Sequence, residues 1–78
     1  MRYTVVYEWA PGTEGAQGNW CSHVPDLPGC VAAGDSLEDT RKLITEAIPF
    51  HIEGLKRSGC PVPKPSARAE EIETGDAA

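Results

Sequence analysis

Two of the three cysteines and both histidines of this 78-residue chain are of types that could together hold a metal ion. Cys21 and His23 are spaced to lie on one face of an extended strand, and His51 and Cys60 would have to complete a zinc site. Structural zinc sites usually take their ligands in close pairs such as Cys-x2-Cys, and the second pair is absent here. The sequence therefore favours no metal ion and no other cofactor, and we expect His51 to pack or to cap near the edge of the sheet.

Catalytic chemistry also finds little support in the pattern of reactive side chains. A nucleophilic pair of Cys21 and His23 would sit about 6.6 Å apart along an extended strand, and nothing nearby identifies an oxyanion hole. Asp35, Glu38 and Asp39 form an acidic cluster, but the helix dipole alone favours carboxylates at a helix start. We therefore expect no catalytic residue and no enzyme activity.

The elements that must position these residues follow from the periodicity of the apolar side chains. Residues 2–9 and 19–24 alternate between apolar and polar positions, which is typical of half-buried strands, and residues 30–33 form a short third strand. A helix is expected to begin after Ser36, which acts as its N-cap, and to end at Gly59. This order predicts an α+β fold of two layers, an antiparallel three-stranded meander with one helix across it.

The predicted helix carries one apolar stripe and one internal proline. Pro49 removes the hydrogen bond to the carbonyl of Thr45, so we expect a kink with helix on both sides. Leu43 and Phe50 are apolar but lie off the stripe, which indicates a second apolar flank. The stripe itself repeats with the helical period and consists of Leu37, Ile44, Ala47, Ile48, Ile52 and Leu55.

A tight turn between the second and third strands holds most of the residues with expected structural roles. Pro28 fixes one φ angle, Gly29 can take the positive φ of a tight reversal, and Asp26 can hydrogen-bond its own backbone. We assign this turn and the helix start a scaffold role. The scaffold residues are Pro25, Asp26, Leu27, Pro28, Gly29, Cys30, Gly34 and Ser36.

An extended tail is predicted after the helix. Residues 60–65 contain three prolines, which favour a polyproline conformation, and residues 69–73 form either a fourth edge strand or a disordered segment. We therefore divide the chain into an α+β domain at residues 1–59 and a tail at residues 60–78.

Charge and composition bear on partners and compartment. The net charge of −5 argues against direct nucleic-acid binding, which needs clustered Lys and Arg, and suits a basic protein partner or serves solubility alone. No apolar run reaches the roughly 20 residues of a membrane span, and the N-terminus has no signal-peptide core, so we predict a cytoplasmic protein without membrane contact. The three cysteines are odd in number and widely spaced, so we expect reduced and mostly buried thiols.

Three stretches of the sequence resemble the HicB-like antitoxins of HicA/HicB toxin–antitoxin systems. They are VPDLPGCVAAGDSLED at residues 24–39, EAIPFHIEGL at 46–55 and SGCPVPKPS at 58–66. The resemblance implies a β-β-β-α-β order and a partial ribonuclease H-like fold without that enzyme's catalytic carboxylates. Many members continue into a C-terminal DNA-binding domain, whereas this chain stops at Ala78, so we do not expect direct promoter binding.

The resemblance also implies a function through a protein partner. HicB-like proteins bind HicA, a small basic mRNA-cleaving toxin, and occlude its active site. We therefore expect an antitoxin that neutralises a HicA-like toxin, with an alternative as a stand-alone oligomeric adaptor, structural or ligand-binding, that has no toxin. Open sheet edges on so small a domain predict a homo-oligomer, either dimer or tetramer. The residues expected to contact the toxin are Glu70, Glu71, Glu73 and Asp76.

Overall fold

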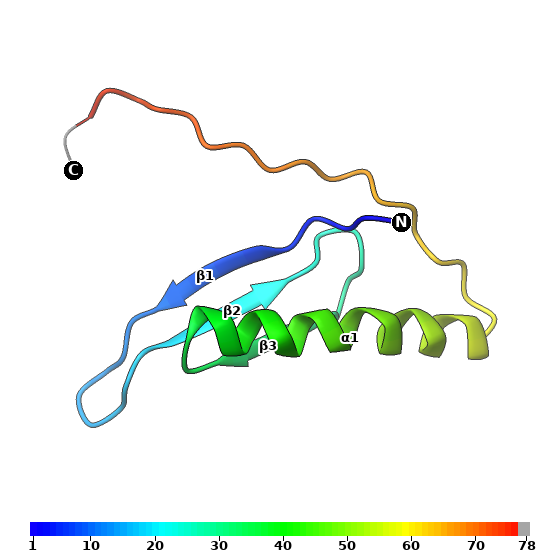
Figure 1. The fold of residues 1–78 in the computed structure, drawn as a ribbon, viewed down its shortest axis with the longest axis horizontal. Helices are drawn as coiled ribbons and strands as arrows, with labels where there is room; N and C mark the ends of the chain where they lie inside the picture. Colours follow the sequence, from blue (N-terminus) through cyan, green and yellow to red (C-terminus); the bar gives the residue numbers. More distant parts are fainter. Residues whose placement is uncertain (77–78) are drawn as a thin grey trace.

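A three-stranded antiparallel sheet packs against one helix in the computed structural model, which describes residues 1–76. Strands β1 (Val6–Ala10), β2 (Asn19–His23) and β3 (Val31–Gly34) are followed by helix α1 (Leu37–Arg57). The strands are arranged in the order β1-β2-β3, and α1 lies along one side of them (Figure 1). The predicted α+β fold with a meander and one helix is confirmed.

The register of the sheet separates a covered face from an open one. Ser22 and Val24 are buried, whereas Cys21 and His23 on the other face are only half-buried, as the alternation in β2 predicts. The hydrogen-bonded part of β1 is shorter than predicted, because the ladder begins where Val6 pairs with His23. Residues 2–5 lie outside the ladder, although Tyr3 and Val5 still pack against the core.

The buried core is small and lies between the sheet, the turn and the helix. Its members come from the end of β2, the following turn and the helix stripe, and the partly buried Ala47, Ile48, Ile52 and Leu55 pack against it. Leu37 belongs to this stripe by its spacing, but it does not share the burial of the other stripe residues. Leu37 is the first residue of α1 and is 45% exposed. The fully or almost fully buried hydrophobic residues are Val24, Leu27, Cys30 and Ile44.

Both ends of α1 are capped as the sequence predicts. The Ser36 hydroxyl accepts a hydrogen bond from the backbone N–H of Asp39 at 3.0 Å, which satisfies a donor that the first turn leaves free. Gly59 has a φ of +72° just beyond the last helical residue, where the chain turns out of the helix. The helix runs from Leu37 to Arg57 and includes Pro49, so helix is present on both sides of the proline as expected.

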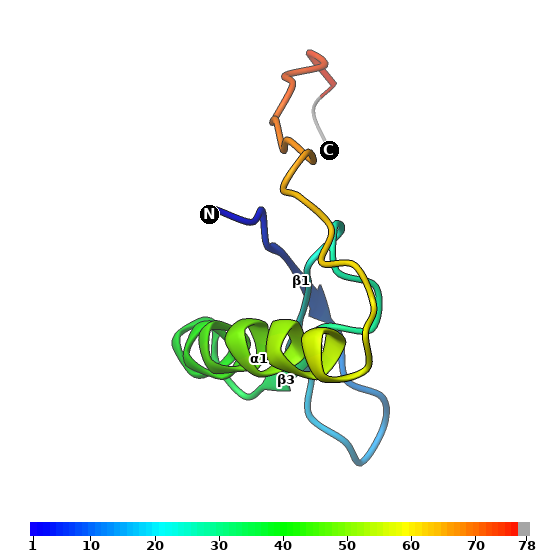
Figure 2. The ribbon, with the colours of Figure 1, turned by 90° about the vertical axis from the view of Figure 1, so that its right-hand side faces the viewer.

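The segment after the helix contains no strand or helix over residues 60–76. Of the two alternatives left for residues 69–73, the edge strand is therefore not formed. The segment leaves the end of α1, passes near the N-terminus and then extends away from the sheet (Figures 1 and 2). The last two residues of the predicted tail lie outside the described residues. Whether residues 1–59 fold as a separate domain stays a prediction.

Candidate functional site

The turn between β2 and β3 is tied together by its own backbone. The N–H of Leu27 donates to the carbonyl of Val24 at 3.0 Å, and the N–H of Cys30 donates to the carbonyl of Leu27 at 3.0 Å. Gly29 has a φ of +88°, a conformation in which an L side chain is strained, and its presence here was predicted. Leu27 is fully buried, whereas the neighbouring Asp26 remains partly exposed. The turn therefore fixes one side chain in the core and presents the next to the outside.

Asp26 binds the segment that follows the helix. Its Oδ2 accepts hydrogen bonds from the backbone N–H groups of Ser66 and Ala67, both at 2.9 Å, and its Oδ1 accepts one from the Ser66 hydroxyl at 2.9 Å. The sequence predicted a local role for Asp26 in its own turn. The structure instead shows its carboxylate reaching residues 40 and 41 positions away. We call this set of three hydrogen bonds the Asp26 latch.

Two side chains near the N-terminus hold the same segment. The Tyr3 hydroxyl donates to the carbonyl of Pro63 at 2.6 Å, and the Thr4 hydroxyl donates to the carbonyl of Ala67 at 2.8 Å. Together with the Asp26 latch, these bonds fix residues 63–67 against the domain. Beyond Ala67 the chain stands away from the sheet (Figures 1 and 2).

The latch also sets the electrostatics of Asp26. The pKa of this carboxyl group lies below its usual value, because the backbone N–H groups of Ala67 and then Ser66 stabilise its charged form. Partial burial opposes this effect, and the Ser66 hydroxyl adds to it. The ionised carboxylate is therefore the form that holds the tail.

We expect the tail to be released by acid. The pKa of Asp26 is depressed in the folded chain, so the latch contributes its full stabilisation at pH values above the ordinary carboxyl pKa. This stabilisation is lost as the pH falls through the folded pKa. The backbone amide NMR signals of Ser66 and Ala67 should then shift together in a single acidic titration step. An Asp26→Asn variant should lack that step, and an identical titration in this variant would contradict the assignment.

The segment at residues 68–76, called here the acidic arm, carries the side chains expected to contact a partner. Glu70, Glu71, Glu73 and Asp76 are all exposed on it. Within the arm, the Thr74 hydroxyl lies 3.5 Å from the Asp76 carboxylate and accepts from the Asp76 N–H at 3.3 Å. The predicted partner residues therefore lie together on one extended segment whose base is held by the Asp26 latch.

The residues considered for metal binding lie in two separate pairs, Cys21 with His23 on the sheet and His51 with Cys60 at the end of α1. Cys21 lies on the open face of the sheet, where its thiol is 3.9 Å from the Asn19 side chain, and His51 packs near Gly29 of the turn. Within residues 1–76, no group of three or more His, Cys, Asp or Glu side chains is arranged to hold a metal ion. The cysteines are free thiols, but the expectation that they are mostly buried is wrong, because Cys30 is buried, Cys21 is half-buried and Cys60 is exposed. Burial raises the pKa of the Cys30 thiol.

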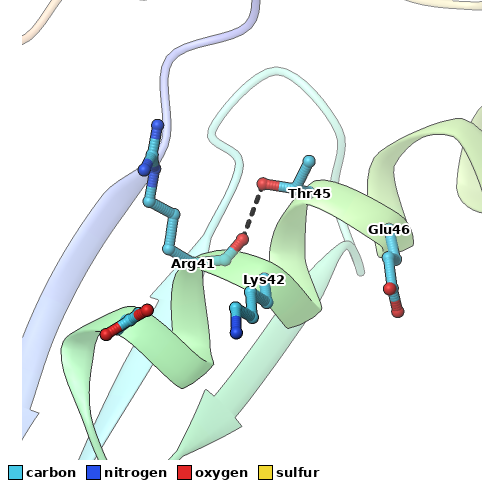
Figure 3. Close-up of a pocket in the computed structure, with 5 residues that line it drawn as sticks. Arg41, Lys42, Thr45 and Glu46 are labelled. Carbon is cyan, nitrogen blue, oxygen red and sulfur yellow. Dashed lines mark hydrogen bonds between the residues drawn. The ribbon is translucent and has the colours of Figure 1, made fainter.

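A shallow pocket on the outer side of α1 is lined by charged side chains of both signs. Glu38, Arg41, Lys42, Thr45 and Glu46 form it. Figure 3 shows Arg41 and Glu46 pointing in different directions, while the Thr45 hydroxyl donates to the carbonyl of Arg41 at 2.6 Å. These groups do not converge on a common point, so the pocket does not offer the arrangement of acid, base and nucleophile that group transfer requires.

Fold and surfaces together define a small α+β protein in which a hydrogen-bonded turn holds the base of an acidic arm. Its sequence matches the family described as "HicB_like antitoxin of bacterial toxin-antitoxin system" over residues 10–77. The chain belongs to this HicB-like antitoxin family, and the antitoxin resemblance drawn from the sequence is confirmed. No helix among residues 1–76 combines the length and hydropathy required to cross a bilayer.

Several individual proteins are similar to the chain. A UPF0150 protein of Thermoplasma acidophilum is 36% identical over 72 residues, which cover 92% of this chain and 94% of that protein. A UPF0150 protein of Synechocystis is 39% identical over 62 residues, covering 80% of this chain and 72% of that protein. An uncharacterized 14.9 kDa protein of Haemophilus phage HP1 is 49% identical over 41 residues. That match covers 53% of this chain and spans about a third of the phage protein's length, at 31%.

No solved structure matches the chain. The partial ribonuclease H-like fold therefore stays a prediction.

Proposed function

We propose that the chain is an antitoxin that binds a small, basic, HicA-type RNA-cleaving toxin and covers its active site, without catalysing a reaction itself. Membership of the HicB-like antitoxin family supports the antitoxin role. The observation that carries the proposal further is the acidic arm, whose base is fixed by the Asp26 latch. A toxin that binds RNA presents a basic surface, and the arm offers carboxylates to that surface.

The charge distribution supports the proposal that the arm is the part that meets the toxin first. Residues 66–78 carry four acidic side chains and one basic one, whereas residues 1–65 carry eight acidic and six basic ones. The arm therefore contributes −3 of the total net charge of −5. Opposite charges on two surfaces steer their encounter, so the arm is expected to raise the association rate more than it slows dissociation.

Neutralisation can be tested with the small open reading frame next to the gene. Expression of that frame alone should arrest growth and cleave mRNA, and co-expression of this chain should restore growth. The purified pair should form a complex in which RNA cleavage is inhibited. Growth arrest that persists in the presence of the folded chain, or a neighbouring frame with no RNase activity, would count against the proposal.

The contribution of the arm has its own expected result. Replacing Glu70, Glu71 and Glu73 by Gln and Asp76 by Asn removes the charge at nearly constant shape. The association rate with the toxin should fall by about 10- to 100-fold at low salt, with little change in the dissociation rate, because long-range steering is lost. Stopped-flow mixing at several salt concentrations measures both rates. A matched variant removes the same number of charges from exposed positions outside the arm, with Glu8→Gln, Glu14→Gln, Asp35→Asn and Glu38→Gln. It should associate much closer to the wild-type rate, and equal losses in both variants would refute a specific role of the arm.

A further inference from the structure

One flank of α1 exposes apolar side chains that the domain leaves uncovered. Phe50 is 80% exposed and Leu43 is 45% exposed. With Gly54 they follow spacings of seven and four residues, which place all three on the same side of a helix. We call this surface the Phe50 flank. Figure 1 shows that the C-terminal half of α1, which holds Phe50 and Gly54, extends past the strands.

Gly54 has no function within its own chain that the structure reveals. A glycine lowers helix propensity, yet Gly54 lies inside α1 and does not have the positive φ that would require a glycine. A Cβ atom at this position would meet nothing within 4 Å. What the missing side chain does create is a groove beside Phe50, lined by Phe50, Glu53, Gly54 and Arg57.

We propose that the Phe50 flank binds the Phe50 flank of a second copy of this chain, with the two α1 helices antiparallel about a twofold axis. In this arrangement Phe50 of each copy lies in the groove over Gly54 of the other. A side chain packing into a groove of a facing helix is the usual way in which helices associate. A twofold contact also requires a surface that is complementary to itself, which a neighbouring knob and groove provide.

The charges around the flank match the same register. When Phe50 lies opposite Gly54 of the second copy, residue 46 lies opposite residue 58. Glu46 is then displaced by only one residue, roughly 1.5 Å along the axis, from Arg57 of the second copy. The twofold axis repeats this pair at the other end of the contact. Arg57 now pairs with Glu53 of its own chain at 2.7 Å, but both side chains are largely exposed and the guanidinium can contact Glu46 as well.

This complementarity is the reason for assigning the flank to a second copy. Opposite charges face each other at both ends of the seam, and the large aromatic side chain faces the residue that has no side chain. Near the twofold axis the Glu53 side chains of the two copies lie about two residues, roughly 3 Å, apart along the axis, and each is paired with Arg57 of its own chain. A single helix pair buries less area than a standard-sized interface, so the dimer is expected to be concentration-dependent. The proposal does not depend on the acidic arm or on toxin binding.

Substitutions in the flank test the proposal by light scattering and sedimentation of the full chain. The wild type should reach dimer mass with rising concentration, and Phe50→Asp should weaken dimerisation at least about tenfold. Gly54→Leu should also weaken it, while increasing the thermal stability of the monomer because leucine favours helix. This opposite effect on fold and dimer excludes misfolding as the cause. The control Val31→Asp, on an exposed residue of β3, should dimerise like the wild type.

A charge exchange tests the register itself. Glu46→Arg and Arg57→Glu should each weaken the dimer, since each places like charges at both ends of the seam. The double variant should regain most of the lost affinity. A chain that stays monomeric at high concentration, a dimer that Phe50→Asp leaves unchanged, or a double variant weaker than both single variants would overturn the proposal. So would a monomeric chain in which Phe50→Asp abolishes toxin binding, because the flank would then belong to the toxin.

Discussion

Replacing Leu27 by alanine is expected to lower the free energy of unfolding by about 2–5 kcal/mol. Leu27 is fully buried, and its side chain comes from the turn rather than from a strand or the helix. The cost combines the lost transfer of the side chain from water with the cavity that it leaves. A small domain has only a modest margin of stability, so a large share of the molecules should be unfolded at growth temperature. Urea denaturation followed by circular dichroism measures the change.

The effect of Leu27→Ala should extend to the tail. Leu27 holds the turn in place, and its neighbour Asp26 holds Ser66 and Ala67. A loosened turn should therefore release residues 63–67 to proteases before the whole domain unfolds. Leu37→Ala is the matched control, because Leu37 is 45% exposed and its truncation should change the stability by less than about 0.5 kcal/mol. Equal losses in the two variants would show that the turn is not part of the core.

The order of elements could be predicted because its signals are local. Ser36 followed three residues later by Asp39 marks the helix start, Gly59 marks its end, and the alternation in β2 assigns its two faces. Each of these features depends on backbone geometry within a few residues. The exposure of Leu37 could not be read from the same periodicity, because the stripe does not tell where the helix begins to overlap the sheet.

The Asp26 latch could not be predicted, because it joins residues 40 positions apart. An aspartate in a Pro-Asp-Leu-Pro turn already has a plausible local hydrogen bond, and local reasoning stops there. One signal was available in the tail. Pro63 and Pro65 have no N–H group, so Ser66 and Ala67 are the first consecutive backbone donors after the proline-rich stretch. A carboxylate within reach of that point is an expected partner for them.

That the acidic residues of the arm contact a toxin stays a prediction. The acidic side chains of the arm could be found from the charge distribution alone, and the structure places them on one exposed segment. The sequence could not reveal which residues of the domain hold the base of the arm. Tyr3, Thr4 and Asp26 contact the base of the arm from two separate parts of the domain, and such contacts depend on the tertiary fold. The fold thus sets where the charge is presented, and the sequence sets how much charge there is.

Gly34→Val is expected to destabilise the chain by about 1–3 kcal/mol, because the start of the helix approaches the sheet closely at this glycine. A Cβ atom here would lie 2.8 Å from the Thr40 hydroxyl oxygen and 3.0 Å from the Thr40 backbone nitrogen. Thr40 cannot easily move aside, since it is fully buried and its hydroxyl donates to the carbonyl of Ser36 at 2.8 Å. Urea denaturation should show the loss at a concentration where the chain is monomeric. Gly54→Ala is the matched control and should stabilise the chain slightly, and a similar loss in both variants would contradict the close approach at Gly34.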